Sequence, residues 1–528
     1  MKKLIIITIL LLIATAVVTV AYFKHLNPPG QRATQVINTI PPSAALIFEF
    51  NNDDSFYDIY QKSSLFSAVT GKNKMAQLHA LRQSVLGNNL LKPFFSDQNI
   101  FVSIHPQRDD SLAFLITIST TTELGNNVIA QAVHQPNVKL KAVKFGKKAG
   151  YALKTDSLDS DFYLANKGSG IWLGSFSKDL VEESLKYAAN EQTSQFVLLP
   201  DQQNATSLGT LYVNYKQVGP LLNQLYKGEN VDFWKGLPML PATATLSLNY
   251  KSDALMFNGF TTFKSAQHIS YVDIFRKMAP VAMDLKNLFP STTAYGCSYA
   301  TPDVKLFKKL LNSWQHKAGL EADKSSLFKK IKNETGVQFN KEFDNLLDNE
   351  FAVITTRFQE KLAIIKVKNG TALRPYLNNI STLTPDEESG QLNYNQVFLF
   401  LLGDALTPFR RPYFIILDNY LVLANSSHDL ANFKQNYLNN EFLNNSADYV
   451  AFNNLLAQRC NVSYFVHFKN AGYVFKRTLK SPYAKAYQQQ PGLKDYYAAS
   501  YQLSASENQY YTNLCFKLNT PDSVSLSR

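Results

Sequence analysis

Short runs of alternating hydrophobic and polar residues recur along the chain, with turn-forming or helical stretches between them. Alternation over residues 100–104 and 112–118 predicts a β-hairpin, because successive side chains of a half-buried strand point to opposite faces. Further strands are expected at 45–50, 162–165, 171–174, 244–250, 255–262, 351–355, 362–367, 501–504 and 511–518. Helices are expected at 56–60, 74–85, 178–187, 304–314 and 324–331, where apolar residues follow helical spacing or a capping residue precedes them.

Many residues of the first half of the chain recur in the second half at a constant spacing. Phe101 returns as Phe351, a shift of 250 residues, and several other residues share that shift. They are Ile104, Leu112, Tyr163, Leu173, Ser177, Asp179 and Leu180, which return as Ile354, Leu362, Tyr413, Leu423, Ser427, Asp429 and Leu430. The expected fold class is therefore α+β, with two tandem homologous repeats, each with its own core. Each repeat would be a mostly antiparallel sheet with helices packed on one face.

The repeats set the expected domain limits. The first α+β repeat should span residues 36–263 and the second 287–528, with a helical connector at 264–286 that is broken at Pro280. In the second repeat, Thr301 should cap the helix at 304–314.

The N-terminus predicts the compartment. Lys2 and Lys3 precede an apolar run over residues 4–23, which as a helix spans about 30 Å and could cross a bilayer. Residues 1–24 are thus expected to be a signal anchor, with 25–35 as a spacer. Basic residues stay on the cytoplasmic side, so the bulk of a single-pass inner-membrane protein would lie on the periplasmic side. The alternative is a signal peptide cleaved after Ala16, which also exports the chain.

Composition and charge indicate which classes of binding partner are expected. The chain is 45% hydrophobic and 13% aromatic, and its 53 Lys and Arg against 41 Asp and Glu give a net charge of +12. The basic residues are dispersed and the chain is expected to be exported, so nucleic acid is not an expected partner. The expected partners are the membrane, through the N-terminal helix, and an envelope protein, lipid headgroups or an acidic polymer.

Two passages carry a family resemblance. The run at 91–102, with its echo at 343–352, and the strand-turn-strand-helix pattern at 163–180 resemble the bacterial membrane-anchored exported family catalogued as domain of unknown function 3352. The resemblance implies an envelope location and offers no catalytic residues to transfer.

The sequence contains no strong metal-binding or cofactor-binding motif. The eight His are scattered, including His105, His428 and His467, and no Cys-x-x-Cys occurs, so a zinc site is not expected. Three carboxylates cluster in a polar turn, but their spacing lacks the glycine and final glutamate of a calcium loop. They are Asp156, Asp159 and Asp161. The lysines at 146–150 lack the spacing of a phosphate-binding loop. No metal ligand and no cofactor are therefore expected.

Candidate nucleophiles have structural interpretations. Ser169 lies between two glycines in a tight turn, and the equivalent Asp418-Asn419-Tyr420 keeps the turn and loses the serine, which indicates a turn role. Ser177 and Ser427 precede an acid and a leucine, as helix N-caps do. The cysteines at 297, 460 and 515 favour buried free thiols, with a disulfide as the alternative.

Two functions follow from these observations. The favoured hypothesis is a non-enzymatic binding or scaffolding protein of the cell envelope, with no catalytic residue. The alternative is an envelope hydrolase with a site in the cleft between the two repeats.

Overall fold

The computed structural model describes most of the chain after residue 34. The described residues are 35–70, 72–107, 111–125, 128–129, 131, 138–155, 158, 160–187, 207–228, 236–263, 270–385 and 387–519.

Twenty strands of the described residues form one hydrogen-bonded sheet. Neighbouring strands in it pair in antiparallel fashion. One end of the sheet has the order β4-β5-β6-β7-β3-β2-β1-β8-β9-β10. These strands are β1 (Leu46–Asn51), β2 (Asn99–Pro106), β3 (Leu112–Ser119), β4 (Val138–Phe145), β5 (Lys148–Thr155), β6 (Phe162–Gly168), β7 (Ile171–Ser175), β8 (Thr210–Asn214), β9 (Ala242–Tyr250) and β10 (Ala254–Phe263).

The other end continues in the order β22-β21-β20-β12-β13-β14-β18-β17-β16-β15. These strands are β12 (Thr293–Ala300), β13 (Leu347–Thr356), β14 (Lys361–Val367), β15 (Ser381–Leu383), β16 (Ser389–Leu392), β17 (Tyr413–Leu417), β18 (Tyr420–Ala424), β20 (Val462–His467), β21 (Tyr496–Ser506) and β22 (Gln509–Leu518). A separate two-stranded sheet pairs β11 (Val281–Ala282) with β19 (Arg459–Cys460).

A seam between β10 and β22 joins the two ends of the sheet. The pairing runs from Ala254 opposite Lys517 to Thr261 opposite Tyr510. Gly259 lies in the middle of β10, where a Cβ would come within 2.0 Å of the Thr245 carbonyl oxygen in β9. Only glycine allows that close approach, so this position keeps β10 paired on both sides.

Buried hydroxyl groups reinforce the seam. Thr261 Oγ1 of β10 lies 2.8 Å from Thr512 Oγ1 of β22 and 2.8 Å from the Tyr215 hydroxyl. Tyr215 also hydrogen-bonds the Tyr501 hydroxyl of β21. Because these groups are buried, each needs such a partner, and the network fixes how the two ends of the sheet meet.

The prediction of two tandem repeats with separate cores is wrong. The seam makes one sheet of the two ends, and the largest hydrophobic cluster draws on both, with Leu246 and Leu255 beside Tyr464 and Leu503. A strand edge left unpaired at the seam would expose backbone groups and apolar side chains, so pairing the two edges lowers the free energy.

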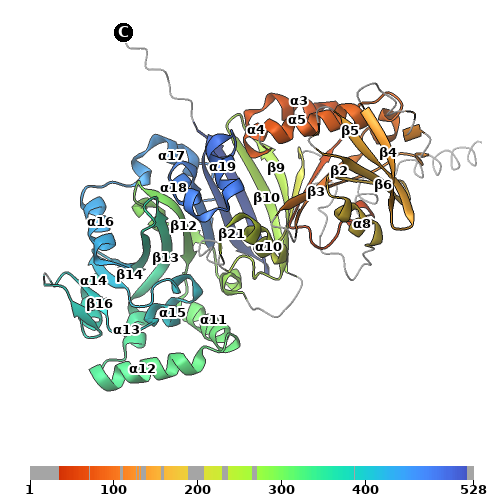
Figure 1. The fold of residues 1–528 in the computed structure, drawn as a ribbon. Coiled ribbons are helices and arrows are strands. Elements are labelled where there is room, and N and C mark those ends of the chain that lie inside the picture. Colours follow the sequence, from red (N-terminus) through yellow and green to blue (C-terminus); the bar gives the residue numbers. More distant parts are fainter. Residues whose placement is uncertain are drawn as a thin grey trace, which may run out of the picture.

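Helices cover both faces of the sheet, whereas one face was expected. In β20, Tyr464 packs into the cluster that contains α18, and its neighbour Phe465 packs into another cluster with Tyr449 and Phe452 of α17. Successive strand residues point to opposite faces, so the two helices lie on opposite sides. In Figure 1, α10, α18 and α19 lie over the central strands.

The helices of the described residues are short. They are α3 (Asp54–Lys62), α4 (Ser64–Thr70), α5 (Lys72–Leu81), α6 (Lys92–Phe95), α8 (Lys178–Lys186), α10 (Tyr215–Leu225), α11 (Val304–Lys317), α12 (Glu321–Thr335), α13 (Phe339–Leu346), α14 (Gly370–Asn378), α15 (Val397–Leu402), α16 (Ser427–Leu438), α17 (Ala447–Asn453), α18 (Phe468–Thr478) and α19 (Ser481–Gln489). A π-helical turn, η1 (Arg82–Leu86), continues α5, and short 3-10 helices include η3 (Tyr271–Lys277), η4 (Leu285–Leu288), η5 (Asp404–Leu406), η6 (Leu443–Asn445) and η7 (Leu493–Asp495).

The predicted transmembrane signal anchor is a second correction. No helix of the described residues is long and apolar enough to cross a membrane. The longest, α12, has 15 residues and carries charged side chains, whereas a span needs about 20 apolar residues. Residues 4–23, on which the anchor prediction rested, lie outside the described residues.

The connector was expected to be helical and broken at Pro280. Its described part contains the 3-10 helix η3 before Pro280, then the short strand β11 and the 3-10 helix η4. In η3, Asp273 and Arg276 form a buried ion pair at 2.6 Å, and Arg276 also donates to the Asn508 carbonyl and stacks on Phe263. These contacts hold the connector against the hairpin of β21 and β22, so it is a packed part of the fold.

Two predicted caps can be compared with the structure. The sequence left Asp53 and Asp54 as alternative caps of the first helix, and it is Asp53 that caps α3, by accepting a hydrogen bond from the Phe56 N–H at 2.7 Å. Thr301 does not cap α11; Asp303 does, by accepting from the Leu306 N–H at 2.9 Å. Thr301 instead donates its hydroxyl to the Asp348 carbonyl, which leaves the carboxylate to cap the helix.

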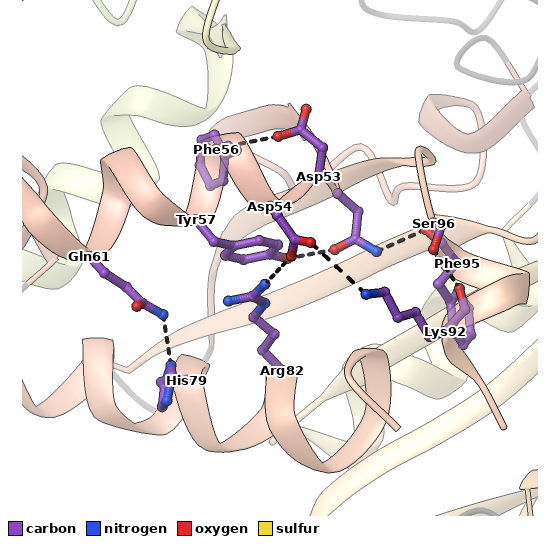
Figure 2. A network of polar contacts seen from close by, with 11 residues as sticks. Asp53, Asp54, Phe56, Tyr57, Gln61, His79, Arg82, Lys92, Phe95 and Ser96 are labelled. Carbon is purple, nitrogen blue, oxygen red and sulfur yellow. Dashed lines mark hydrogen bonds and ion pairs between the residues drawn. The ribbon is translucent and has the colours of Figure 1, made fainter. Parts of the chain in front are cut away.

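A polar network holds the first helices together (Figure 2). The Arg82 guanidinium stacks on the Tyr57 ring at 3.6 Å and pairs with Asp54 at 3.0 Å. The Tyr57 hydroxyl donates to Asn52, whose side chain donates to the Phe95 carbonyl. The network links α3, η1 and α6 to one another, and we assign it a structural role.

Replacing Arg276 with alanine should lower the free energy of unfolding by about 3 to 5 kcal/mol, because Asp273 would stay buried without that cation. Urea unfolding followed by tryptophan fluorescence measures the change. The matched control is Lys277→Ala at the exposed neighbouring position, which should change stability by less than about 0.5 kcal/mol. Equal effects of the two variants would contradict the assignment.

Candidate functional site

A groove of about 1690 Å³ lies beside the seam and is lined by residues from both ends of the sheet. We call it the central groove. One wall comes from α18, α19 and strands β20 to β22, and the other from β3, the residues flanking it, and the start of α8. Leu225 and Tyr226, at the end of α10, and Leu479, after α18, also line it.

Backbone hydrogen bonds fix the floor of the central groove where α10 and α18 end. The Lys227 N–H donates to the Thr478 carbonyl at 2.7 Å, and the Lys480 N–H donates to the Leu225 carbonyl at 2.8 Å. Tyr226 and Leu479 form an isolated antiparallel bridge between these bonds. The two helices are therefore tied end to end, and the groove does not depend on side chains alone for its shape.

The wall from α18, α19 and β22 is aromatic. Phe475 of α18 meets Tyr487 of α19 edge-on, with ring centroids 5.3 Å apart, and Phe468 stacks on Phe516 of β22 at 6.5 Å. The Tyr487 hydroxyl donates to the Phe468 carbonyl at 2.7 Å, which holds α19 on α18. Such ring pairs add attraction beyond simple burial, so this wall is preformed.

The opposite wall carries most of the polar side chains of the groove, and we call it the polar wall. Its described residues include hydroxyl, amide and carboxylate groups at Ser43, Gln77, Gln107, Ser111, Ser160, Ser177, Asp179 and Glu183, beside the apolar side chains of Pro106, Leu112, Ala113, Phe114 and Phe176. The Gln224 amide donates to the Gln107 carbonyl at 2.9 Å and so joins α10 to the end of β2. The central groove is thus amphipathic across its width.

A serine and a histidine meet at the edge of this polar wall. The Ser43 hydroxyl lies 2.9 Å from His105 Nδ1, and Ser103 lies 2.8 Å from His105 Nε2. Ser103 also donates to the Leu115 carbonyl at 3.3 Å, so it can accept from Nε2 and leave Nδ1 to accept from Ser43. This is the contact that a serine nucleophile makes with its base.

The electrostatics do not suit base catalysis at Ser43. Burial lowers the pKa of His105 to about 3, whereas an effective general base has a pKa near the working pH. The group on Nε2 is a hydroxyl, which cannot stabilise an imidazolium as a carboxylate does. We interpret the contact as a tie between the turn at Ser43 and β2.

The serines considered from sequence have structural roles. Ser177 caps α8 by accepting from the Leu180 N–H at 3.3 Å, as predicted. Ser427 is not a cap, because its neighbour Ser426 accepts from the Asp429 N–H at 3.1 Å and caps α16. Ser169 lies at positive φ in the turn between β6 and β7. Of these, only Ser177 lines the central groove.

The remaining candidates are dispersed. Cys297, Cys460 and Cys515 are free and buried, and burial raises the pKa of each thiol. Burial lowers the pKa of His467, on β20, to about 4. Asp156 and Asp159 lie outside the described residues, and no group of three or more potential metal ligands occurs in the part that the structure describes.

The sequence interpretation missed the aromatic residues of the groove. Phe468 and Phe475 are seven residues apart, and Tyr483 and Tyr487 are four apart, which places each pair on one helix face. That spacing is also typical of core residues, so it could not distinguish a groove wall from a packed core. Comparison of the chain with protein-family models, curated proteins and solved structures found no match.

Folding should depend on pH through His105. The folded protein keeps His105 neutral to about pH 3, whereas an unfolded histidine binds a proton near pH 6.5, so stability is full above 6.5 and is lost as the pH falls. The loss is at most about 1.4 kcal/mol per pH unit for one histidine. His105→Gln should flatten the profile between pH 6 and 4, as measured by urea unfolding. A profile parallel to that of the unaltered protein would contradict this.

Proposed function

We propose that the chain is a non-enzymatic binding protein whose central groove holds an elongated ligand with an apolar body. The observation that carries the proposal is the size of the groove together with its aromatic wall. Ligand sites of proteins usually enclose about 300 to 1000 Å³ and have mostly hydrophobic linings with a few polar groups. The central groove exceeds that range and has this kind of lining.

The geometry favours binding over reaction. The aromatic wall sits largely on α18, α19 and the strands beside them, and backbone bonds tie α18 to α10, so a ligand meets a preformed surface there and little ordering energy is lost. Each Å² of apolar surface that the ligand buries contributes roughly 25 cal/mol. The alternative, a hydrolase acting in the same groove, has Ser43 and His105 as its strongest candidates, and the low pKa of His105 disfavours it.

The partners expected from sequence stay predictions. They are an envelope protein, lipid headgroups or an acidic polymer, and export of the chain rests on residues outside the described structure. The lining of the central groove favours a further kind of ligand, one with an apolar body, which the sequence did not predict.

An uncharged fluorophore, N-phenyl-1-naphthylamine, tests the proposal because its emission rises in apolar surroundings. We expect saturable binding with a Kd on the order of micromolar. Ala486→Trp places a large ring on α19 where the native alanine lines the groove, and should weaken binding by roughly tenfold or more.

The matched control is Lys485→Trp, which adds the same ring at the exposed neighbouring position outside the lining. It should bind the dye as the unaltered protein does. Thermal unfolding of both variants checks that the fold is kept. Unsaturable binding, or equal weakening by both variants, would refute the proposal.

A further inference from the structure

Two stripes of charge run along α8, and they face different ways. Asp179 and Glu183 are four residues apart, so they lie on one face, and both line the central groove. The other stripe contains Glu182 and Lys186, which pair with each other at 2.8 Å, and neither lines the groove. The carboxylates of Asp179 and Glu183 therefore line the groove, whereas the ion pair of Glu182 and Lys186 lies outside it.

These two carboxylates lack cationic partners in the described part of the chain. Neither forms an ion pair with another described residue. The Glu183 carboxylate lies 3.4 Å from the Ser43 hydroxyl, whose single proton can go either to Glu183 or to His105 Nδ1. Like charges four residues apart on a helix repel and cost a few tenths of a kcal/mol. The helix dipole explains an acid in the first turn, such as Asp179, but not Glu183 in the second.

The charge of the groove lining differs from the charge of the whole chain. Asp179 and Glu183 are the only charged residues among the described residues that line the groove, although the whole chain has a net charge of +12. The described lining of the groove is therefore acidic, on a chain that is basic as a whole. A charged cleft with low-dielectric walls concentrates ligands of the opposite charge.

The aromatic wall suits the same ligands. Tyr483, Tyr487 and Phe475 present rings to the groove, and the faces of such rings attract organic cations. An anionic headgroup would meet two like charges and find no Lys or Arg in the described lining. Carboxylates and aromatic rings together complement a positive charge.

We propose that the central groove selects amphiphiles with a cationic, ammonium-type head and an apolar chain. This inference rests on the proposed binding function. The head lies by Asp179 and Glu183, and the chain lies along the aromatic wall of α18 and α19.

Competition with the bound fluorophore tests the selectivity. Decylamine, decanoate and decanol share one alkyl chain and at pH 7.5 carry a positive, a negative and no charge. Decylamine should displace the dye at a concentration about tenfold lower than decanoate, since each exposed ion pair contributes up to about 1 kcal/mol. Added salt should reduce that ratio, because it screens exposed charges.

The double variant Asp179→Asn/Glu183→Gln should remove the preference for decylamine and leave the affinity for decanol within about twofold. Glu182→Gln is the control, because it removes one charge from the same helix outside the groove and should keep the preference. Thermal unfolding checks that each variant is folded.

The outcomes separate the two proposals. If all three compounds displace the dye equally, if decanoate is preferred, or if the double variant keeps the preference, the cation inference is wrong and the binding function stands. If the dye itself does not bind saturably, both are wrong.

Discussion

The backbone pairing of β10 with β22 is the contact on which the rest of the architecture depends. It joins strands from the middle and the end of the chain and so makes one sheet of the described strands. Both edges carry unpaired N–H and C=O groups until they meet, and their side chains belong to the largest hydrophobic cluster. The tyrosine and threonine hydroxyls at Tyr215, Thr261 and Thr512 add a buried polar network that specifies one alignment.

The central groove is a consequence of that seam. Because β22 lies beside β10, α18 and α19 line the same groove as α8 and the residues around β3, and the ends of α10 and α18 can bond to each other. An aromatic wall from the end of the chain then faces a polar wall from its first third. Neither wall makes the groove alone, since the aromatic rings of α18 and α19 lie on one wall and the carboxylates of α8 lie on the other.

Local sequence patterns predicted much of the secondary structure. The hairpin of β2 and β3 and the cap at Ser177 follow from alternation and from a side chain that bonds a nearby N–H group, whereas for α3 the sequence only narrowed the cap to Asp53 or Asp54. Local competition explains the errors, since Thr301 and Asp303 can both reach the start of α11 and only their partners decide which one caps it. The apolar connector is buried from several sides, and its described helical segments are two short 3-10 helices.

The separate cores expected from the 250-residue recurrence were wrong because a recurring pattern describes local elements and does not say which strand edges pair. The candidate site was harder to predict from the sequence than the fold. Asp179 and Glu183 have the right spacing to share a helix face, but no spacing shows that the face meets a groove. The sequence by itself determined eleven strands of the sheet, the cap at Ser177, the aromatic content and the charge, because these depend on neighbouring residues. The tertiary structure alone decided the seam, the shared core and the groove, because these depend on contacts between residues hundreds of positions apart.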